Sequence, residues 1–394
     1  MNVGDTVELR IESLAFGADA VARKDGWVIF VQGALPGETV QAQITQRKSS
    51  FYKALLKNIV RPSPHRQTSP CAYFPECGGC QYLHLEYSAQ IEAKRQQVQD
   101  VLERIGKVEF PAIRTVACKE PLHYRNRVKL HVLRSGPELQ LGFMNATGRK
   151  IVPIEHCMIS DPLINNTLAP LREKLKKIPV AKTVTVRANP EGKVDFWTEN
   201  LPIAKGTTLT ERVRDKIFEA PSASFFQVNP PMTEALVNEV EGFLNVDSQV
   251  LIDAYCGVGL FSVVFGSKFQ QVIGIEQDQD SVRWARKNMR ANGLGAGVFY
   301  EGRVERLLEK ALSNGHGKII TVILDPPRDG CHKDVISNLC KSRPEQIVYV
   351  SCNPPTLARD LGRLSSAYKV IGVTLIDMFP QTMHCEVVVN LRPA

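Results

Sequence analysis

The stretch that decides the fold is residues 249–261, QVLIDAYCGVGLF, an apolar run that ends in an acid and continues into a glycine-rich turn. Three further apolar runs follow it, at residues 272–276 (VIGIE), 319–325 (IITVILD) and 347–352 (IVYVSC). Helical patterns such as residues 281–292 and 333–341 separate these runs. Regular alternation of buried strands with helices predicts an α/β fold with a parallel, doubly wound sheet.

The ends of the first two strands carry ligand-binding residue types. Asp253 is followed by Tyr255, Gly257 and Gly259, and Glu276 ends the next strand 23 residues after Asp253. In parallel sheets ligands bind beyond the carboxyl ends of the strands, where glycines admit the ligand and an acid can hold ribose hydroxyls. Because the third glycine of a dinucleotide fingerprint is replaced by Ser262, an adenosyl ligand without phosphates is favoured. The alternative is a glycine turn that only connects strand to helix.

Two more strand ends carry reactive side chains. Asp325 opens the rigid sequence DPPR, and Cys352 ends the last apolar run just before a helix expected from about Thr356. The positive end of that helix is expected to lower the pKa of the Cys352 thiol, as a cysteine nucleophile requires. The alternatives are a turn or helix-capping Asp and an inert buried Cys.

The N-terminal half has a different pattern. Residues 3–60 alternate apolar and polar positions between glycine turns and predict a small antiparallel barrel, and residues 61–70 predict a linker with three prolines. A helix is expected at residues 88–105, with Ser88 as N-cap and its apolar face made by the residues Ile91, Val98, Val101, Leu102 and Ile105. Residues 110–215 predict mixed strands with a helix near 161–176.

Length and composition exclude several classes of protein. The 394 residues are 43% hydrophobic and 23% charged, which predicts two or three globular domains rather than a disordered chain. No apolar run is long enough for a membrane helix and the N-terminus does not read as a secretion signal, so a cytoplasmic protein without membrane association is expected. Ten Cys are too dilute for a disulfide scaffold, so clustered Cys indicate metal binding or catalysis.

One cysteine cluster has metal-ligand spacing. Cys71, Cys77 and Cys80 lie within ten residues, and Gly78-Gly79 allow the tight backbone that a C-x2-C pair needs around a metal. The fourth ligand would be Cys118 or Cys157. The residues alone leave zinc and an iron-sulfur cluster equally open.

Basic residues are concentrated in two runs. Residues 41–70 contain six Lys or Arg, among them Lys48 and Lys53, with no acid and with Phe51 and Tyr52 between them. Residues 114–134 contain six more, including Arg125 and Arg127, with one acid. The net charge of +8 and the interleaved aromatic residues suit RNA, although a charge run also occurs on ordinary solvated surfaces.

The sequences SCNPPTLARDL, DPPRDG, DAYCGVG, FFQVN and MHCEVVVNL together resemble the RNA (uracil-5-)-methyltransferase family, over nearly the whole chain. Residues 1–60 resemble the TRAM domain, an oligonucleotide-binding barrel. The resemblance implies three domains, namely a TRAM barrel (1–62), a central domain (63–220) and a Rossmann-like methyltransferase domain that uses S-adenosylmethionine (221–394).

The resemblance also implies residue roles. Cys352 would be the nucleophile that adds to uracil carbon 6, and Glu386 the base that removes the carbon-5 proton. Contacts to S-adenosylmethionine are implied for the residues Gln227, Tyr255, Gly257, Glu276 and Asp325. RNA contacts are expected for the residues Phe225, Lys48, Lys53, Arg125 and Arg127. Pro355 and Cys385 depart from the usual family residues and touch none of these roles.

The sequence Glu155-His156-Cys157-Met158 resembles the distant fourth cysteine of the iron-sulfur branch that modifies 23S ribosomal RNA. It implies a [4Fe-4S] cluster held by the residues Cys71, Cys77, Cys80 and Cys157, with zinc as the rival. Ribosomal RNA is therefore the expected partner of a monomeric enzyme, with transfer RNA as the alternative.

Three other functions are alternatives. An amino-group methyltransferase would give Cys352 and Glu386 no role. A non-catalytic metal-stabilised RNA scaffold would give no role to the reactive residues at the strand ends. A radical enzyme would need a C-x3-C-x2-C triad, which the sequence lacks. Loss of uracil methylation in Cys352→Ala would separate the family function from the first two.

Overall fold

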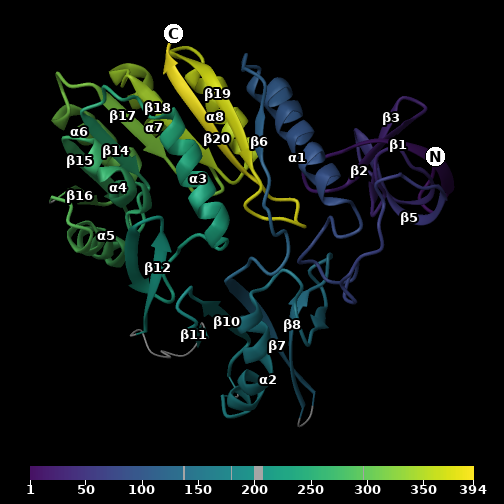
Figure 1. Cartoon of the computed structure of the whole chain (residues 1–394). Coiled ribbons are helices and arrows are strands. Elements are labelled where there is room, and N and C mark those ends of the chain that lie inside the picture. Colours follow the sequence, from purple (N-terminus) through teal and green to yellow (C-terminus); the bar gives the residue numbers. More distant parts are fainter. Residues whose placement is uncertain (136–137, 179, 199–206, 296) are drawn as a thin grey trace.

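The computed structural model describes residues 1–135, 138–178, 180–198, 207–295 and 297–394. Figure 1 shows a small barrel at the N-terminus, a layered sheet and helices at the C-terminus, and a smaller sheet with one long helix between them in sequence. In the described part of the chain, no helix combines the length and the apolar character that crossing a bilayer requires.

The barrel is closed, with strand order β1-β2-β3-β5-β4. Its strands are β1 (Thr6–Leu14), β2 (Ala20–Lys24), β3 (Trp27–Gln32), β4 (Thr39–Arg47) and β5 (Phe51–Arg61). The expected barrel is therefore present, but the pair β3 and β5 is parallel rather than antiparallel. Alternation in a sequence shows which side chains face inward and does not show which strands are neighbours, so this pairing was not predictable.

The large sheet has eight strands in the order β16-β15-β14-β17-β18-β20-β19-β6. They are β6 (Arg114–Val116), β14 (Val250–Ala254), β15 (Gln271–Glu276), β16 (Val298–Glu301), β17 (Ile320–Leu324), β18 (Gln346–Ser351), β19 (Tyr368–Ile376) and β20 (Glu386–Pro393). Strands β14 to β18 are parallel, as predicted. Strand β20, for which no prediction was made from the sequence, runs antiparallel to both of its neighbours.

Helices cover both faces of this sheet. They are α3 (Pro230–Phe243), α4 (Leu260–Phe265) with the short η2 (Gly266–Lys268), α5 (Gln279–Ala291), α6 (Val304–Asn314), α7 (Lys333–Ser342) and α8 (Pro354–Leu364). Alternate strand residues divide between the two cores: Leu251 packs with α3, α4 and α5, whereas Ile252 packs with α6, α7 and α8. Burial on both faces explains the continuous apolar runs in the sequence.

Helix α1 (Tyr87–Val101) and the π-helical turn η1 (Leu102–Gly106) pack onto the second of these cores through Val98 and Leu102. The predicted helix is present, but Glu86 rather than Ser88 is its N-cap, and Ile105 is 51% exposed. The inward face of α1 also carries three polar residues, Gln90, Lys94 and Gln97.

The smaller sheet has the order β11-β10-β7-β8-β9. It is formed by β7 (Arg127–Ser135), β8 (Glu138–Met144), β9 (Ile151–Pro153), β10 (Thr183–Ala188) and β11 (Val194–Trp197), with α2 (Pro162–Lys176) packed on it. A separate hairpin of β12 (Thr208–Val213) and β13 (Lys216–Pro221) packs against the large sheet's helices. Hence the segment between the barrel and residue 221 contributes α1, β6 and this hairpin to the C-terminal layers.

Candidate active site

A cleft of about 1840 Å³ opens at the carboxyl ends of the parallel strands. The predicted site residues that line it are Phe225, Gln227, Tyr255, Gly257, Glu276, Asp325, Cys352, Glu386 and Arg125. Residues from five strand ends and from a loop before α3 thus meet in one place, whereas Lys48, Lys53 and Arg127 do not line the cleft.

The glycine turn after β14 forms one end of the cleft. Gly257 and Gly259 both have positive φ, and a Cβ on Gly259 would lie 3.3 Å from the Cβ of Ala285, so glycine is required there. The Glu276 carboxylate accepts hydrogen bonds from the Gly257 N–H (3.1 Å) and the Asp278 N–H (2.8 Å). Glu276 is therefore held at the cleft edge by one backbone N–H of the glycine turn and one at the start of α5.

The third position of the glycine pattern has a structural role. Ser262 is buried in the first turn of α4 and donates both its N–H and its hydroxyl to one oxygen of Asp253, at 2.8 and 2.6 Å. The other Asp253 oxygen has no hydrogen-bond partner in the described part of the chain. Ser262 therefore orients an acid below the turn.

Two carboxyl groups lie next to each other under the cleft. Burial raises the pKa of Asp253 to about 6, and burial with the nearby Asp253 charge raises the pKa of Asp325 to about 7. Two carboxylates in one poorly solvated place repel each other, and a bound cation relieves that repulsion. This end of the cleft therefore favours a positively charged ligand.

Cys352 and Glu386 come from adjacent strands of the large sheet. Ser351 at the end of β18 pairs with Val387 near the start of β20; Cys352 directly follows Ser351, and Glu386 directly precedes Val387. Cys352 is half-buried and Glu386 is 3% exposed, and both line the cleft. The antiparallel strand β20 therefore brings a carboxyl group beside the thiol.

The expected lowering of the Cys352 pKa is wrong for this structure. Helix α8 does begin just after Cys352, but burial and the nearby Glu386 and Asp325 charges raise the pKa of the thiol to about 11. Burial and Asp325 also raise the pKa of Glu386 well above its ordinary value. Desolvation and like charge outweigh the helix end here.

Arg328 is the cationic group at the thiol, and it was not among the predicted site residues. Its side chain hydrogen-bonds Cys352 and opposes the rise of the thiol pKa. Its carbonyl accepts hydrogen bonds from the side chains of Asn353 (2.7 Å) and Thr356 (3.1 Å) at the start of α8. The signal in the sequence was its place in DPPR, directly after the strand that ends near Asp325.

The segment FFQVN lies at the other side of the cleft. Phe225 is 68% exposed at the cleft, Phe226 packs on Phe218, and Gln227 is buried. Arg127 donates to the carbonyls of Ser224 (3.0 Å) and Ala223 (3.3 Å) and lies over the Trp197 ring. Arg127 therefore supports the backbone just before Phe225.

A second cavity of about 310 Å³ contains all four predicted cluster ligands, Cys71, Cys77, Cys80 and Cys157. The other candidate, Cys118, is buried elsewhere, where it accepts from the Asn229 amide (3.9 Å). Three residues line both cavities, namely Arg125, Arg328 and Phe379. Within the described ranges, no group of three or more His, Cys, Asp or Glu side chains is placed to hold a single metal ion.

The backbone around these cysteines is tightly packed. A Cβ on Gly78 would lie 2.9 Å from the backbone of Asn145, so only glycine fits there. The Cys157 backbone exchanges hydrogen bonds with the Asn165 side chain, at 2.8 and 3.1 Å. Burial raises the pKa of Cys77 and Cys80, so a bound cation would be needed to keep them as thiolates.

The two basic runs differ in the structure. Lys48, Lys53 and Lys57 are exposed on the barrel, where Arg47 lies over the Trp27 ring at 5.6 Å. In the second run, Arg114 pairs with Glu239, and Arg134 donates to backbone carbonyls at the end of α2. Two of the basic residues of the expected second patch, Arg114 and Arg134, therefore make contacts within the protein.

Comparisons with known proteins give concordant matches. Residues 193–393 match the family described as tRNA (Uracil-5-)-methyltransferase, and residues 1–56 match the TRAM domain. An uncharacterized RNA methyltransferase of Caldanaerobacter subterraneus is 34% identical, with 98% of each chain covered. One of Halalkalibacterium halodurans is 30% identical over 100% of this chain and 98% of the relative.

A solved structure matches the whole architecture. The tRNA (uracil-54, C5)-methyltransferase of Pyrococcus abyssi, in complex with S-adenosyl-L-homocysteine, superposes with a TM-score of 0.75. The match covers 98% of this chain and 99% of that chain at 24% sequence identity, which establishes the shared fold.

Proposed function

This chain belongs to the tRNA (uracil-5-)-methyltransferase family of RNA methyltransferases and carries an N-terminal TRAM domain, and from that membership we propose that it methylates carbon 5 of a specific uridine in 23S ribosomal RNA. The observation that carries the proposal is the register of β18 and β20, which sets Cys352 beside Glu386 in the cleft. A nucleophile and a base at adjacent positions suit the adjacent carbons 6 and 5 of a uracil ring.

The chemistry needs both residues because carbon 5 of uracil is a weak nucleophile. In the proposed reaction the Cys352 sulfur, as thiolate, bonds to carbon 6, and the ring electrons shift so that carbon 5 becomes nucleophilic. The Arg328 side chain stabilises the thiolate by its hydrogen bond. The target base must leave its stack to reach this buried thiol.

When bound, S-adenosylmethionine supplies the electrophilic methyl group. Glu386 then takes the carbon-5 proton, the C5–C6 double bond forms again, and the bond between carbon 6 and the Cys352 sulfur breaks. Because Glu386 has a raised pKa, it holds the abstracted proton readily in this buried place. The products would be 5-methyluridine and S-adenosylhomocysteine, with Cys352 released as the thiolate and the proton held by Glu386.

The cofactor would be held at the glycine end of the cleft. Tyr255 and Gly257 come from the turn after β14, and Glu276 is the acid placed for ribose hydroxyls. Gln227 and Asp325 would contact the part that carries the methyl group, where the paired Asp253 and Asp325 charges favour a sulfonium cation.

We assign the second cavity to a [4Fe-4S] cluster held by the residues Cys71, Cys77, Cys80 and Cys157. The support is that four thiols from two distant segments line one cavity, next to the residues that line the cleft. Four-cysteine ligation leaves no open iron position, so the cluster would have a structural or RNA-recognition role.

RNA would contact the protein at three places. The exposed Lys48 and Lys53 of the barrel would bind phosphates, Arg125 lines the cleft, and Phe225 offers a stacking surface beside it. Arg127 would act indirectly by supporting the backbone next to Phe225.

The experiment that tests this function offers the enzyme two RNA substrates. Anaerobically purified protein and S-adenosylmethionine are incubated with unmodified 23S ribosomal RNA or with unmodified transfer RNA, and nucleosides are measured by mass spectrometry. 5-Methyluridine in the ribosomal RNA alone is expected. If 5-methyluridine appeared only in transfer RNA, the substrate would be transfer RNA and not ribosomal RNA. If it appeared in neither RNA, the proposed function would be wrong.

A further inference from the structure

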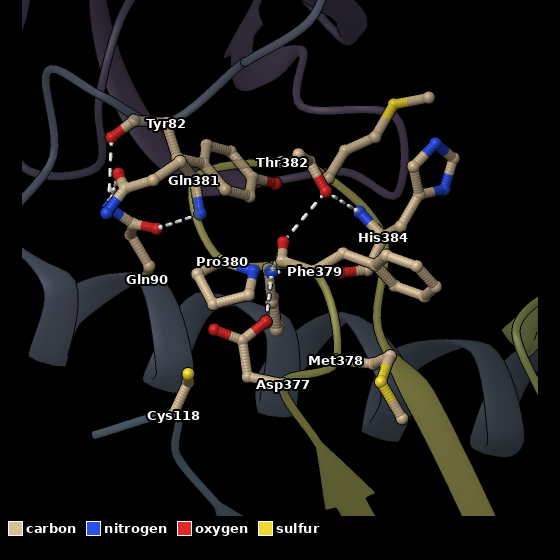
Figure 2. Close-up of polar contacts among 12 residues, drawn as sticks. Tyr82, Gln90, Cys118, Asp377, Met378, Phe379, Pro380, Gln381, Thr382 and His384 are labelled. Atoms are coloured by element: carbon tan, nitrogen blue, oxygen red, sulfur yellow. Dashed lines mark hydrogen bonds and ion pairs between the residues drawn. The ribbon is translucent and has the colours of Figure 1, made fainter. Parts of the chain in front are cut away.

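The loop of residues 377–385 joins β19 to β20 and leads directly into Glu386. Its first residue, Asp377, forms an ion pair with Lys94 of α1 at 2.6 Å, and neither side chain is exposed to solvent. A buried charge pair is costly unless its hydrogen bonds are complete, so its partners are informative. Figure 2 shows this loop and the side chains around it.

Lys94 holds both ends of the loop. Besides Asp377, its ammonium group donates to the carbonyls of Phe379 (3.1 Å) and His384 (2.8 Å). All three of its N–H donors are therefore used. The second Asp377 oxygen accepts from the Tyr87 hydroxyl at 2.8 Å, also from α1.

The middle of the loop has its own anchor. The Gln90 amide nitrogen donates to the Gln381 side-chain oxygen (2.9 Å), and the Gln381 N–H donates back to the Gln90 oxygen (3.2 Å). The Gln381 carbonyl accepts from the N–H groups of Gln81 and Tyr82, directly after Cys80. Helix α1 thus fixes this loop at its ends and at its centre.

The loop lies next to both cavities. Phe379 lines the cleft and the cysteine cavity, and His384 lines the cysteine cavity two residues before Glu386. The place of the Glu386 carboxylate therefore depends on where this loop is held, whereas Cys352 and Arg328 are held by α8 and its contacts.

We propose that Lys94 is a positioning residue: by tying the two ends of this loop, it sets the Glu386 carboxylate at the distance from Cys352 that carbon-5 proton removal requires. This inference rests on the proposed function. Small displacements of a general base slow its step strongly, and Lys94 contacts neither the thiol nor its arginine. Loss of Lys94 should therefore slow the release of the methylated adduct more than its formation.

The test measures the two steps separately in Lys94→Met. The fraction of enzyme in denaturation-stable covalent complex with RNA reports adduct formation, and tritium release from RNA labelled at uracil carbon 5 reports proton removal. We expect release to slow about 10- to 100-fold, a part of what a general base contributes, while covalent complex accumulates as in Glu386→Gln. Binding of S-adenosylmethionine should be unchanged.

Two further variants distinguish a displaced Glu386 carboxylate from a general loss of protein stability. Arg95→Met changes the neighbouring residue of α1, whose ion pair with Glu92 lies at the surface, and should leave both steps unchanged. Lys94→Met/Asp377→Asn removes both buried charges, so the step can be measured even where the single variant fails to fold. It should show the same accumulation of adduct.

Equal loss of formation and release, or no change in either, in a folded Lys94 variant would overturn the inference. A Glu386→Gln variant without any covalent complex would instead overturn the proposed function, independently of Lys94.

Discussion

Cys352 and Glu386 are neighbours in the cleft, because the last residue pair of β18 and β20 is Ser351 with Val387, Cys352 directly follows Ser351, and Glu386 directly precedes Val387. The thiol and the carboxylate thus reach one ligand from neighbouring points. The sheet makes the two groups neighbours, and the loop of residues 377–385, which leads directly into Glu386, is held by α1.

Replacement of Arg328 should slow the attack of the Cys352 thiolate on the uracil ring. In Arg328→Gln the Cys352 thiolate loses its charged hydrogen-bond donor, so the thiol pKa rises further above about 11. Covalent complex formation should slow by about 10-fold for each unit of that rise, and the deficit should shrink as the pH is raised. Rates of adduct formation between pH 7 and 10 check this, and a pH-independent deficit would contradict it.

Replacement of Asp325 should stabilise the free protein at high pH. The pKa of Asp325 is raised to about 7, so its contribution to stability is complete below about pH 4 and is lost as the pH rises through 7. Asp325→Asn should therefore raise the unfolding midpoint at pH 8 by about 2–4 °C or more, with little change at pH 4. Thermal unfolding without cofactor at both pH values measures this.

The same Asp325 variant should bind S-adenosylmethionine more weakly, because it lacks a charge to pair with the sulfonium. Equal destabilisation at both pH values, with unchanged cofactor affinity, would remove Asp325 from the cofactor site.

Each cluster cysteine should be needed for iron. Cys71→Ser, Cys77→Ser, Cys80→Ser and Cys157→Ser should each lower bound iron and the visible absorbance of anaerobically purified protein. Cys340→Ser changes a cysteine of α7 outside that cavity and serves as the control. Iron and sulfide analysis is the measurement, and stoichiometric zinc in the unchanged protein would contradict the cluster assignment.

The barrel lysines should govern the salt dependence of RNA binding. In the triple variant Lys48→Ala/Lys53→Ala/Lys57→Ala, the log–log slope of affinity against salt should fall by up to about 2, at roughly 0.7 for each lost phosphate contact. A triple variant of the exposed residues Lys318, Lys341 and Lys369 is the matched control. An unchanged slope in the barrel variant would remove the barrel from RNA binding.

Much of the fold was predictable because buried parallel strands leave continuous apolar runs. Asp253, Glu276, Asp325 and Cys352 all lie at or next to the ends of such runs, and strand ends in a parallel sheet meet at one edge. Glu386 could be placed only by its resemblance to a family motif, because the antiparallel return of β20 leaves no periodic signal.

Other features depended on contacts between distant segments. The inward face of α1 carries Lys94 and Gln90, whose partners in the loop of residues 377–385 lie more than 280 residues away, so a search for apolar periodicity does not find them. The raised pKa of Cys352 has a similar cause, because local sequence shows the helix that follows and not the buried carboxyl groups beside it.

The most direct measurement is tritium release from RNA labelled at uracil carbon 5, with wild-type enzyme and Cys352→Ala, in the presence and absence of S-adenosylmethionine. We predict stoichiometric release with 5-methyluridine formation only when both the cofactor and Cys352 are present. Methylation of RNA by Cys352→Ala at the wild-type rate, or methyl transfer without any tritium release, would contradict it.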